Sequence, residues 1–183
     1  MLEVYATPAA QPWLAEVYSC APQGIVLRVA NNPALADLTI RLGEPDRWPA
    51  AAYRIGSEDI LVLASPRSPL PDLTLEETRV LFASQGAPSV QVWVYAEGED
   101  VQKVFEQVVM AGRAVTSWAR LAVGPQHMSE ALSNNPNAVG LLPRRWLTSN
   151  LRALFVIPNV PVLALVENEP QGALRALLAC LQP

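Results

Sequence analysis

Few side chains in this sequence could carry out covalent chemistry. His127 is the only histidine, and Glu130 is spaced to share a helix face with it. No second histidine or cysteine lies near them to complete a metal site, so we interpret His127 as a surface residue of a short helix. The sequence contains no G-x-S-x-G elbow and no glycine-rich phosphate loop. We expect no catalytic residue, no metal site and no cofactor.

The acidic residues occur partly in adjacent pairs, and this spacing does not suit acid–base catalysis. Neighbours on a strand point to opposite faces of the sheet, and neighbours on a helix diverge by about 100°. The pairs concerned are Glu58-Asp59, Glu76-Glu77 and Glu99-Asp100. The sequence therefore predicts a protein that is not an enzyme.

The two cysteines, Cys20 and Cys180, lie near opposite ends of the chain. This separation excludes the C-x-x-C spacing of zinc and redox sites. A bridge between them would close a long loop and could stabilise the fold by about 4 kcal/mol or more. The spacing alone does not show whether their Cα atoms approach closely enough, so both the paired and the free state stay open.

Composition excludes two classes of partner. Charged residues make up only 16% of the 183 residues and the net charge is -4, so no dense basic stripe is available for nucleic acid. The apolar run from Val160 to Val166 is much shorter than the roughly 20 residues of a membrane helix. Residues 1–5 read as a first strand and not as a leader, because Glu3 follows the start at once. Either the protein is cytosolic or a leader has been removed.

Short strands alternate with helices along the chain, which favours parallel sheets covered on both faces. Thr74 and Glu77 form the pattern of a capping box at the start of a helix. The expected strands are 2–6, 25–30, 38–42, 59–64, 90–95, 138–142, 153–157 and 162–166, and the expected helices are 9–20, 74–83, 101–110, 126–133 and 172–181.

Three segments resemble the phosphate-binding components of bacterial ABC importers, which have the type II periplasmic substrate-binding fold. Residues 73–83, Leu-Thr-Leu-Glu-Glu-Thr-Arg-Val-Leu-Phe-Ala, are similar to a helix of that family. Residues 131–143, which include Asn-Pro-Asn-Ala-Val-Gly-Leu-Leu-Pro, resemble the family's most specific stretch. Residues 161–166 and the helix after them are similar to its return strand and final helix.

The resemblance implies an α/β, two-lobed type II periplasmic-binding-protein-like fold, in which each lobe is a mostly parallel sheet flanked by helices. It implies that residues 1–86 and 148–183 form lobe 1, that residues 87–147 form lobe 2, and that a ligand binds in the cleft between them. Loops at the carboxyl ends of parallel strands and the amides at helix starts gather in such clefts.

Three residues that follow strands of the first lobe are candidate ligand contacts. Thr7 is the contact that the family resemblance implies, although it could simply cap the helix after it. Asn31 and Ser65 also follow strands. For each of these two, an ordinary turn role is the alternative interpretation.

The sequence departs from the family in the second lobe, where phosphate binders carry an arginine and a Ser-Gly-Thr run. Here residues 95–100 read Tyr-Ala-Glu-Gly-Glu-Asp, and these carboxylates would oppose an oxyanion. One interpretation is that Glu97 and Gly98, with Trp118 nearby, hold a cationic or hydroxylated ligand. The other is that the acidic run is a solvated helix cap in a degenerate cleft.

We therefore expect an extracytoplasmic solute-binding protein of the ABC-importer type, periplasmic or lipid-anchored, that closes two lobes on a small ligand other than phosphate. Its expected partners are that ligand and an ABC permease, and we expect a monomer that binds no nucleic acid. The alternative is a sensory or interaction module with the same fold and a degenerate cleft.

Overall fold

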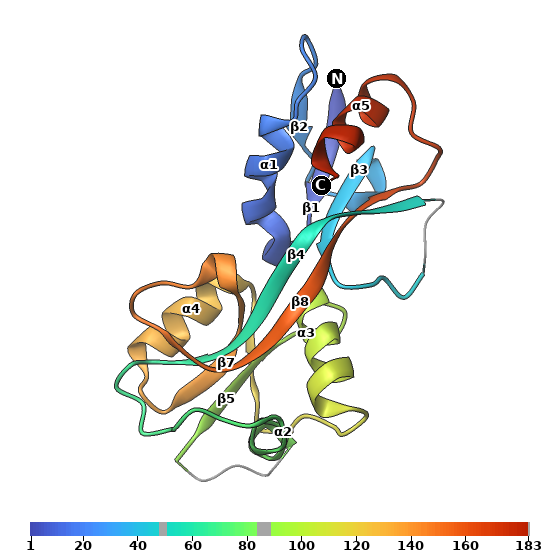
Figure 1. The fold of residues 1–183 in the computed structure, drawn as a ribbon. Helices are drawn as coiled ribbons and strands as arrows, with labels where there is room; N and C mark the ends of the chain where they lie inside the picture. Colours follow the sequence, from blue (N-terminus) through green and yellow to red (C-terminus); the bar gives the residue numbers. More distant parts are fainter. Residues whose placement is uncertain (48–50, 84–88, 183) are drawn as a thin grey trace. The chain divides into compact units, whose positions relative to one another are not determined.

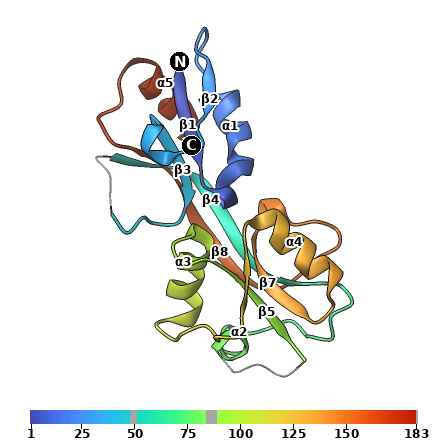
Figure 2. The same ribbon diagram turned by 180° about the vertical axis from the view of Figure 1, so that it is seen from behind.

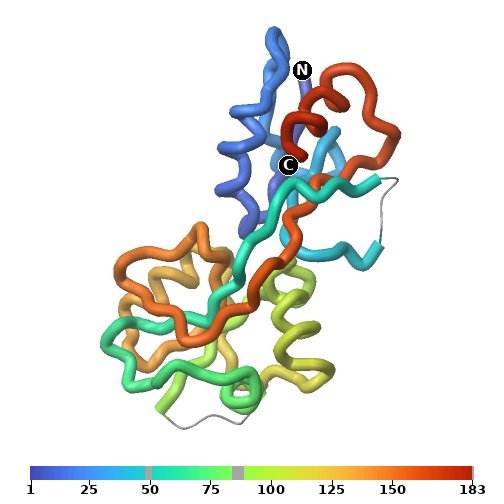
Figure 3. The backbone as a smooth tube through the Cα atoms, viewed as in Figure 1, coloured from blue at the N-terminus to red at the C-terminus, as the bar shows by residue number. Residues whose placement is uncertain are grey.

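The computed structural model describes residues 1–47, 51–83 and 89–182. The chain divides into two compact units, of which unit 1 contains Met1–Glu58 and Pro161–Pro183 and unit 2 contains Asp59–Val160. Figure 3 shows the chain passing twice between the units. The boundary that we expected at residues 86 and 87 lies outside the described residues, and the one expected at residues 147 and 148 falls inside unit 2.

Eight strands follow the order β2-β1-β3-β8-β4-β7-β5-β6 in one mixed sheet. The strands are β1 (Leu2–Ala6), β2 (Leu27–Val29), β3 (Leu38–Leu42), β4 (Ala51–Ala64), β5 (Gln91–Tyr95), β6 (Arg120–Ala122), β7 (Ala138–Pro143) and β8 (Arg152–Val166). In unit 1, β2, β1 and β3 are parallel and β8 is antiparallel to β3. In unit 2, β7, β5 and β6 are parallel and β4 is antiparallel to β7.

Helices cover these sheets within each unit. Unit 1 carries the 3-10 helices η1 (Pro8–Trp13) and η2 (Pro33–Leu35) and the helices α1 (Leu14–Ser19) and α5 (Gly172–Leu181). Unit 2 carries α2 (Leu75–Ala83), α3 (Asp100–Phe105), the π-helical turn η3 (Glu106–Met110), α4 (Pro125–Asn134) and the 3-10 helix η4 (Arg144–Trp146). Figures 1 and 2 show α3 and α4 on opposite sides of β5 and β7.

Side-chain alternation along the strands builds the two cores. On β3, Leu38, Ile40 and Leu42 are fully buried, whereas Thr39 and Arg41 face the other side of the sheet and are half-buried. In unit 2, the rings of Phe82 and Phe105 meet at 4.6 Å between centroids. Burying apolar side chains on one strand face therefore leaves the opposite face of β3 with a threonine and an arginine.

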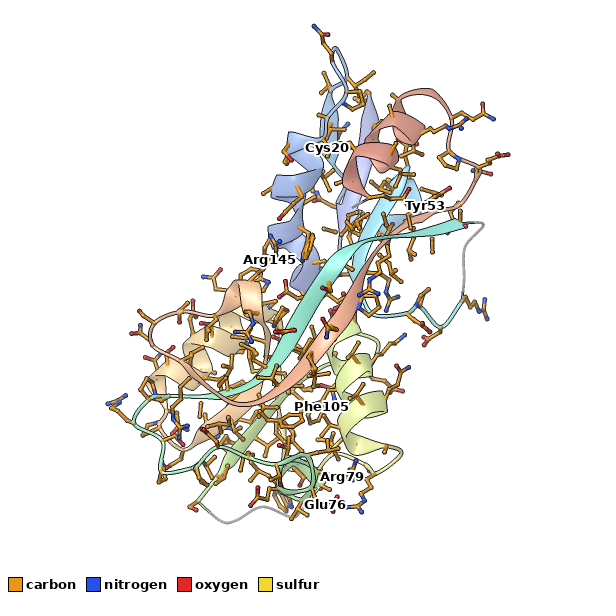
Figure 4. All side chains as sticks on the ribbon, in the orientation of Figure 1. Cys20, Tyr53, Glu76, Arg79, Phe105 and Arg145 are labelled. Carbon is orange, nitrogen blue, oxygen red and sulfur yellow. A yellow bond between two sulfur atoms is a disulfide. The ribbon has the colours of Figure 1, made fainter. Side chains whose placement is uncertain are left out.

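The predicted capping box forms at the start of α2. The Glu77 carboxylate accepts the Thr74 N–H at 2.7 Å, and the Thr74 hydroxyl accepts the Glu77 N–H at 3.3 Å. Glu76 and Arg79 form an ion pair of 2.6 Å on the same helix, as Figure 4 shows. Both bonds of the box satisfy amides that would otherwise have no partner in the first helical turn.

A disulfide joins Cys20 to Cys180, with an S–S distance of 2.05 Å and a Cα–Cα distance of 5.7 Å. Cys20 follows the last residue of α1 (Figure 4), and Cys180 lies in α5. The bridge is internal to unit 1 and ties the end of its first α-helix to its last helix.

The predicted fold class is confirmed, and four predicted elements need correction. The helix expected over residues 9–20 is η1 followed by α1, because Pro12 interrupts the α-helical bonding. The strand expected at residues 59–64 is the second half of β4. The strands expected at residues 153–157 and 162–166 are one strand, β8. No helix within residues 1–47, 51–83 and 89–182 is long and apolar enough to cross a membrane.

Candidate functional site

Thr7 lies at the carboxyl edge of the unit 1 sheet. Ala6 pairs with Ile40 in the parallel ladder, and the Thr7 N–H donates to the Ile40 carbonyl at 3.0 Å. This bond extends the ladder by one residue, so that Thr7 stands opposite Arg41. The Thr7 side chain makes no capping hydrogen bond to η1. A side-chain cap therefore does not explain the threonine at this position.

Arg41 is a polar residue at this edge that we had not selected from the sequence. Its Nε atom is buried and has no hydrogen-bond partner in the described part of the chain. A buried donor without an acceptor is rare and destabilises the folded state. The signal in the sequence is an arginine between two apolar residues, Ile40 and Leu42, whose burial dictates the strand face.

A hollow of about 440 Å³ opens beside β2, and Asn31 is one of its lining residues. The others are Glu3, Arg28, Val29, Ala30, Asn32 and Leu35. Arg28 and Glu3 form an ion pair of 3.4 Å. Asn32, and not Asn31, caps η2 through its Oδ1, which accepts the Ala34 N–H at 3.0 Å. The structure thus places Asn31 in a small hollow whose two charges offset each other.

The acidic run lies at the carboxyl end of β5, where the sequence places it. Glu97 and Gly98 are exposed in a turn, and Gly98 has a φ of 101°, a conformation that favours glycine. Glu99 is the N-cap residue and Asp100 the first residue of α3. Only Asp100 is buried, with 2% of its surface exposed. Three carboxylates thus meet around one helix start.

Burial and the charges of this run raise the pKa values of two side chains, Glu99 and Tyr95. Burial, and secondly the charge of Asp100, raise the pKa of Glu99. Burial, followed by the charges of Asp100 and Glu99, raises the pKa of Tyr95, whose hydroxyl donates to the Leu141 carbonyl at 2.8 Å. The Asp100 Oδ1 atom accepts the Val101 N–H at 2.8 Å. A carboxylate of the protein itself therefore takes an amide that an oxyanion ligand would need.

Ser65 and Trp118 lie at the opposite edge of the unit 2 sheet from Glu97. Ala64 pairs with Val139 near the amino end of β7, because β4 runs antiparallel to β7. Ser65 is 1% exposed, and its hydroxyl accepts the Arg67 N–H at 3.3 Å, which is a turn role. This is the turn role that we gave as the alternative for Ser65, and a contact with a ligand stays a prediction.

The expected position of Trp118 beside the acidic run needs correction, because Trp118 precedes β6. Arg120 of β6 pairs with Trp93 of the parallel strand β5. Trp118 therefore lies near the amino end of β5, whereas Glu97 follows its carboxyl end, and 74% of the Trp118 surface is exposed. Trp118 does not contribute an aromatic wall to the acidic run.

His127 forms local contacts within unit 2. Its Nδ1 atom accepts the Val123 N–H at 3.3 Å, and its ring meets the Trp93 ring edge-on with centroids 5.4 Å apart. Within the described ranges, no group of three or more histidine, cysteine or acidic residues could hold a metal ion.

These features belong to the two-lobed fold of periplasmic binding proteins. A protein from Clostridium perfringens assigned as a phosphate ABC transporter substrate-binding protein, with bound phosphate, superposes with a TM-score of 0.80 at 12% identity, over 98% of this chain and 91% of that chain. The regulatory domain of HypT from Salmonella typhimurium gives 0.68 at 12% identity, over 98% and 92%. The CcmR regulatory domain of Synechocystis PCC6803, in complex with 2-PG, gives 0.66 at 15% identity, over 97% and 95%.

The similarity lies in the fold and not in detectable sequence relationship. No protein-family model matches the chain, and no curated protein does. Among the structural neighbours, binding proteins and regulatory domains share one architecture. The choice between these roles therefore depends on the residues described above.

Proposed function

We propose that this chain is an extracytoplasmic solute-binding protein of the ABC-importer type, which binds a small ligand other than inorganic phosphate. The fold supports ligand binding in general, because the neighbours include proteins solved with phosphate and with 2-PG. An ABC permease would be the partner that receives the ligand. We expect the protein to act as a monomer and to perform no covalent chemistry on its ligand.

The Cys20–Cys180 disulfide is the observation that carries the location and, with it, the transport role. Disulfides form and persist in oxidising compartments and are rare in the cytosol. A sensory module that works in the cytosol would keep both thiols reduced. The bridge therefore favours a binding protein outside the cytoplasm.

The acidic edge of unit 2 supports the exclusion of phosphate. The Asp100 carboxylate already accepts the Val101 N–H, and burial, followed by the charge of Asp100, raises the pKa of Glu99. Two unit charges about 4 Å apart repel by roughly 1 kcal/mol in water and by several times more where solvent is partly excluded. A phosphate dianion at this edge would meet that repulsion.

A thermal-shift screen followed by calorimetry tests the proposal. The oxidised protein is screened with oxyanions, amino acids, polyamines and sugars, because a ligand that binds only the native state raises the melting temperature by mass action. We expect a hit outside the phosphate class and no micromolar binding of phosphate at neutral pH. A screen without any hit would favour the sensory or interaction module, and micromolar phosphate binding would contradict the ligand assignment.

A further inference from the structure

We infer that Arg41 binds a carboxylate group of the ligand and so makes this protein selective for carboxylate-bearing small molecules. This inference rests on the proposed function, since it names the chemical class that the protein takes up. It concerns only the carboxyl edge of the unit 1 sheet.

One nitrogen of the Arg41 guanidinium lacks an acceptor among the described residues. Other arginines have acceptors: Arg79 donates to the Val109 carbonyl at 2.6 Å, and Arg144 pairs with Asp59 at 3.0 Å. Arg41 has the only arginine nitrogen in residues 1–47, 51–83 and 89–182 that is buried without a hydrogen-bond partner. The fold thus holds one N–H donor of this guanidinium, at Nε, out of water and without an acceptor from these residues.

The alternation of β3 fixes the direction of the Arg41 side chain. Ile40 and Leu42 are fully buried on the core face, so the alternation of β3 directs Arg41 to the opposite face. On that face it is paired with Leu163 of β8 and stands opposite Thr7. Leu163 offers no acceptor from its side chain. We infer that this buried Nε–H donor is satisfied by an acceptor from outside the chain.

Neither Thr7 nor Pro8 offers a backbone N–H to a ligand at this edge. The Thr7 N–H is already used by the Ile40 carbonyl, and η1 begins with Pro8, which has no N–H. Backbone amides at helix starts are the usual recognition groups for phosphate. The Thr7 N–H is therefore unavailable and Pro8 offers none, whereas the Arg41 Nε–H at this edge has no acceptor within the ranges that the structure describes.

The hydrogen-bond geometry of a guanidinium matches that of a carboxylate. The planar fork of arginine presents parallel N–H donors that bind the two oxygens of a carboxylate at once. One guanidinium balances one negative charge. Phosphate, which carries more than one charge near neutral pH, would need a further cation, and Arg28 of the same unit is already paired with Glu3. The ligand class that fits is a small monocarboxylate, amino acids included.

The test compares carboxylates with uncharged analogues on the oxidised full chain. A panel of small carboxylates and amino acids is measured beside the corresponding primary amides and beside inorganic phosphate, by thermal shift and calorimetry. We expect carboxylates to bind and their amides not to bind. In Arg41→Gln the affinity should fall by about 10- to 100-fold, the loss expected for charge-assisted hydrogen bonds.

Two controls keep the result interpretable. Arg67→Gln makes the same change of charge at an exposed position in a turn of unit 2 and should bind as the wild type does. Arg41→Lys keeps the charge but loses the fork, so its affinity should lie between those of Arg41→Gln and the wild type.

A second readout does not need a ligand. If the Arg41 Nε atom lacks an acceptor in the unliganded protein, Arg41→Gln should unfold at a higher temperature than the wild type, by about 2–4 °C. A lower melting temperature would show that Arg41 has a structural partner and would overturn the inference.

The outcomes also separate this inference from the proposed function. Ligands that bind equally well as amides, or that bind Arg41→Gln as tightly as wild type, overturn the carboxylate assignment and leave the binding protein intact. Absence of any ligand contradicts both.

Discussion

Removal of the Cys20–Cys180 bridge should cost this protein a large part of its stability. The bridge spans 160 residues of sequence, and the chain-entropy treatment gives about 5 kcal/mol for a loop of that length. If unit 2 stays folded while unit 1 unfolds, the effective loop is about threefold shorter, which lowers the effect by only about 1 kcal/mol. The double variant Cys20→Ser/Cys180→Ser should therefore lose about 4–5 kcal/mol and melt about 10–20 °C lower.

Denaturant unfolding followed by hydrogen exchange measures this loss in each unit separately. Both cysteines belong to unit 1, so the amides of β1 and β3 should lose protection at lower denaturant, whereas those of β5 and β7 should change little. Wild-type protein treated with reductant should reproduce the double variant. Equal midpoints for the oxidised wild type and the double variant, or two free thiols by mass spectrometry, would refute the assignment of the bridge.

Two further predictions concern packing and pH. A Cβ atom added in Gly56→Ala would lie 2.5 and 2.7 Å from carbons of the Trp13 ring, so chemical denaturation should show a loss of about 1–3 kcal/mol, whereas Gly124→Ala, where the added Cβ has no atom within 4 Å, should be nearly neutral. Burial and the charge of Asp100 raise the folded-state pKa of Glu99 above its usual value of 4.5, so the folded state binds more protons than the unfolded state and stability should fall as the pH rises above about 4.5. Glu99→Gln should remove that slope in melting temperatures measured across this pH range, and an unchanged slope would contradict the shift.

Local patterns in the sequence predicted the elements whose causes are local. The capping box of Thr74 and Glu77 defined the start of α2, and the alternation of residues 38–42 defined β3 with its buried face. The two long strands, β4 and β8, were predicted too short. Pro158 and Pro161 lie within β8, where Asn159 adopts a φ of 58°. Pairing with the neighbouring strands maintains β8 on both sides of these prolines, and the local sequence does not predict it.

The candidate site was predicted less well than the fold, because its composition depends on strand direction. Ser65 and Glu97 both follow strands, and from the sequence we expected them in different lobes that face one ligand cleft. The antiparallel pairing of β4 with β7 places them at opposite edges of unit 2. Pairing direction is set by contacts between residues far apart in the chain, and no local pattern reports it. Arg41 was missed for a related reason, since its lack of a partner is a property of the packed structure.

In each unit, a backbone amide at the carboxyl edge of the sheet is hydrogen-bonded to an acceptor of the protein itself. In unit 1 the Thr7 N–H belongs to the β-ladder and Pro8 has none, and in unit 2 the Val101 N–H belongs to Asp100. Anion recognition by amides at helix starts needs such groups to be unoccupied. Their occupation in both units supports our proposal that this chain, although it has the fold of phosphate binders, takes a ligand other than phosphate. Our inference assigns recognition to a side chain instead, because the planar guanidinium of Arg41 presents parallel N–H donors that match the two oxygens of a carboxylate.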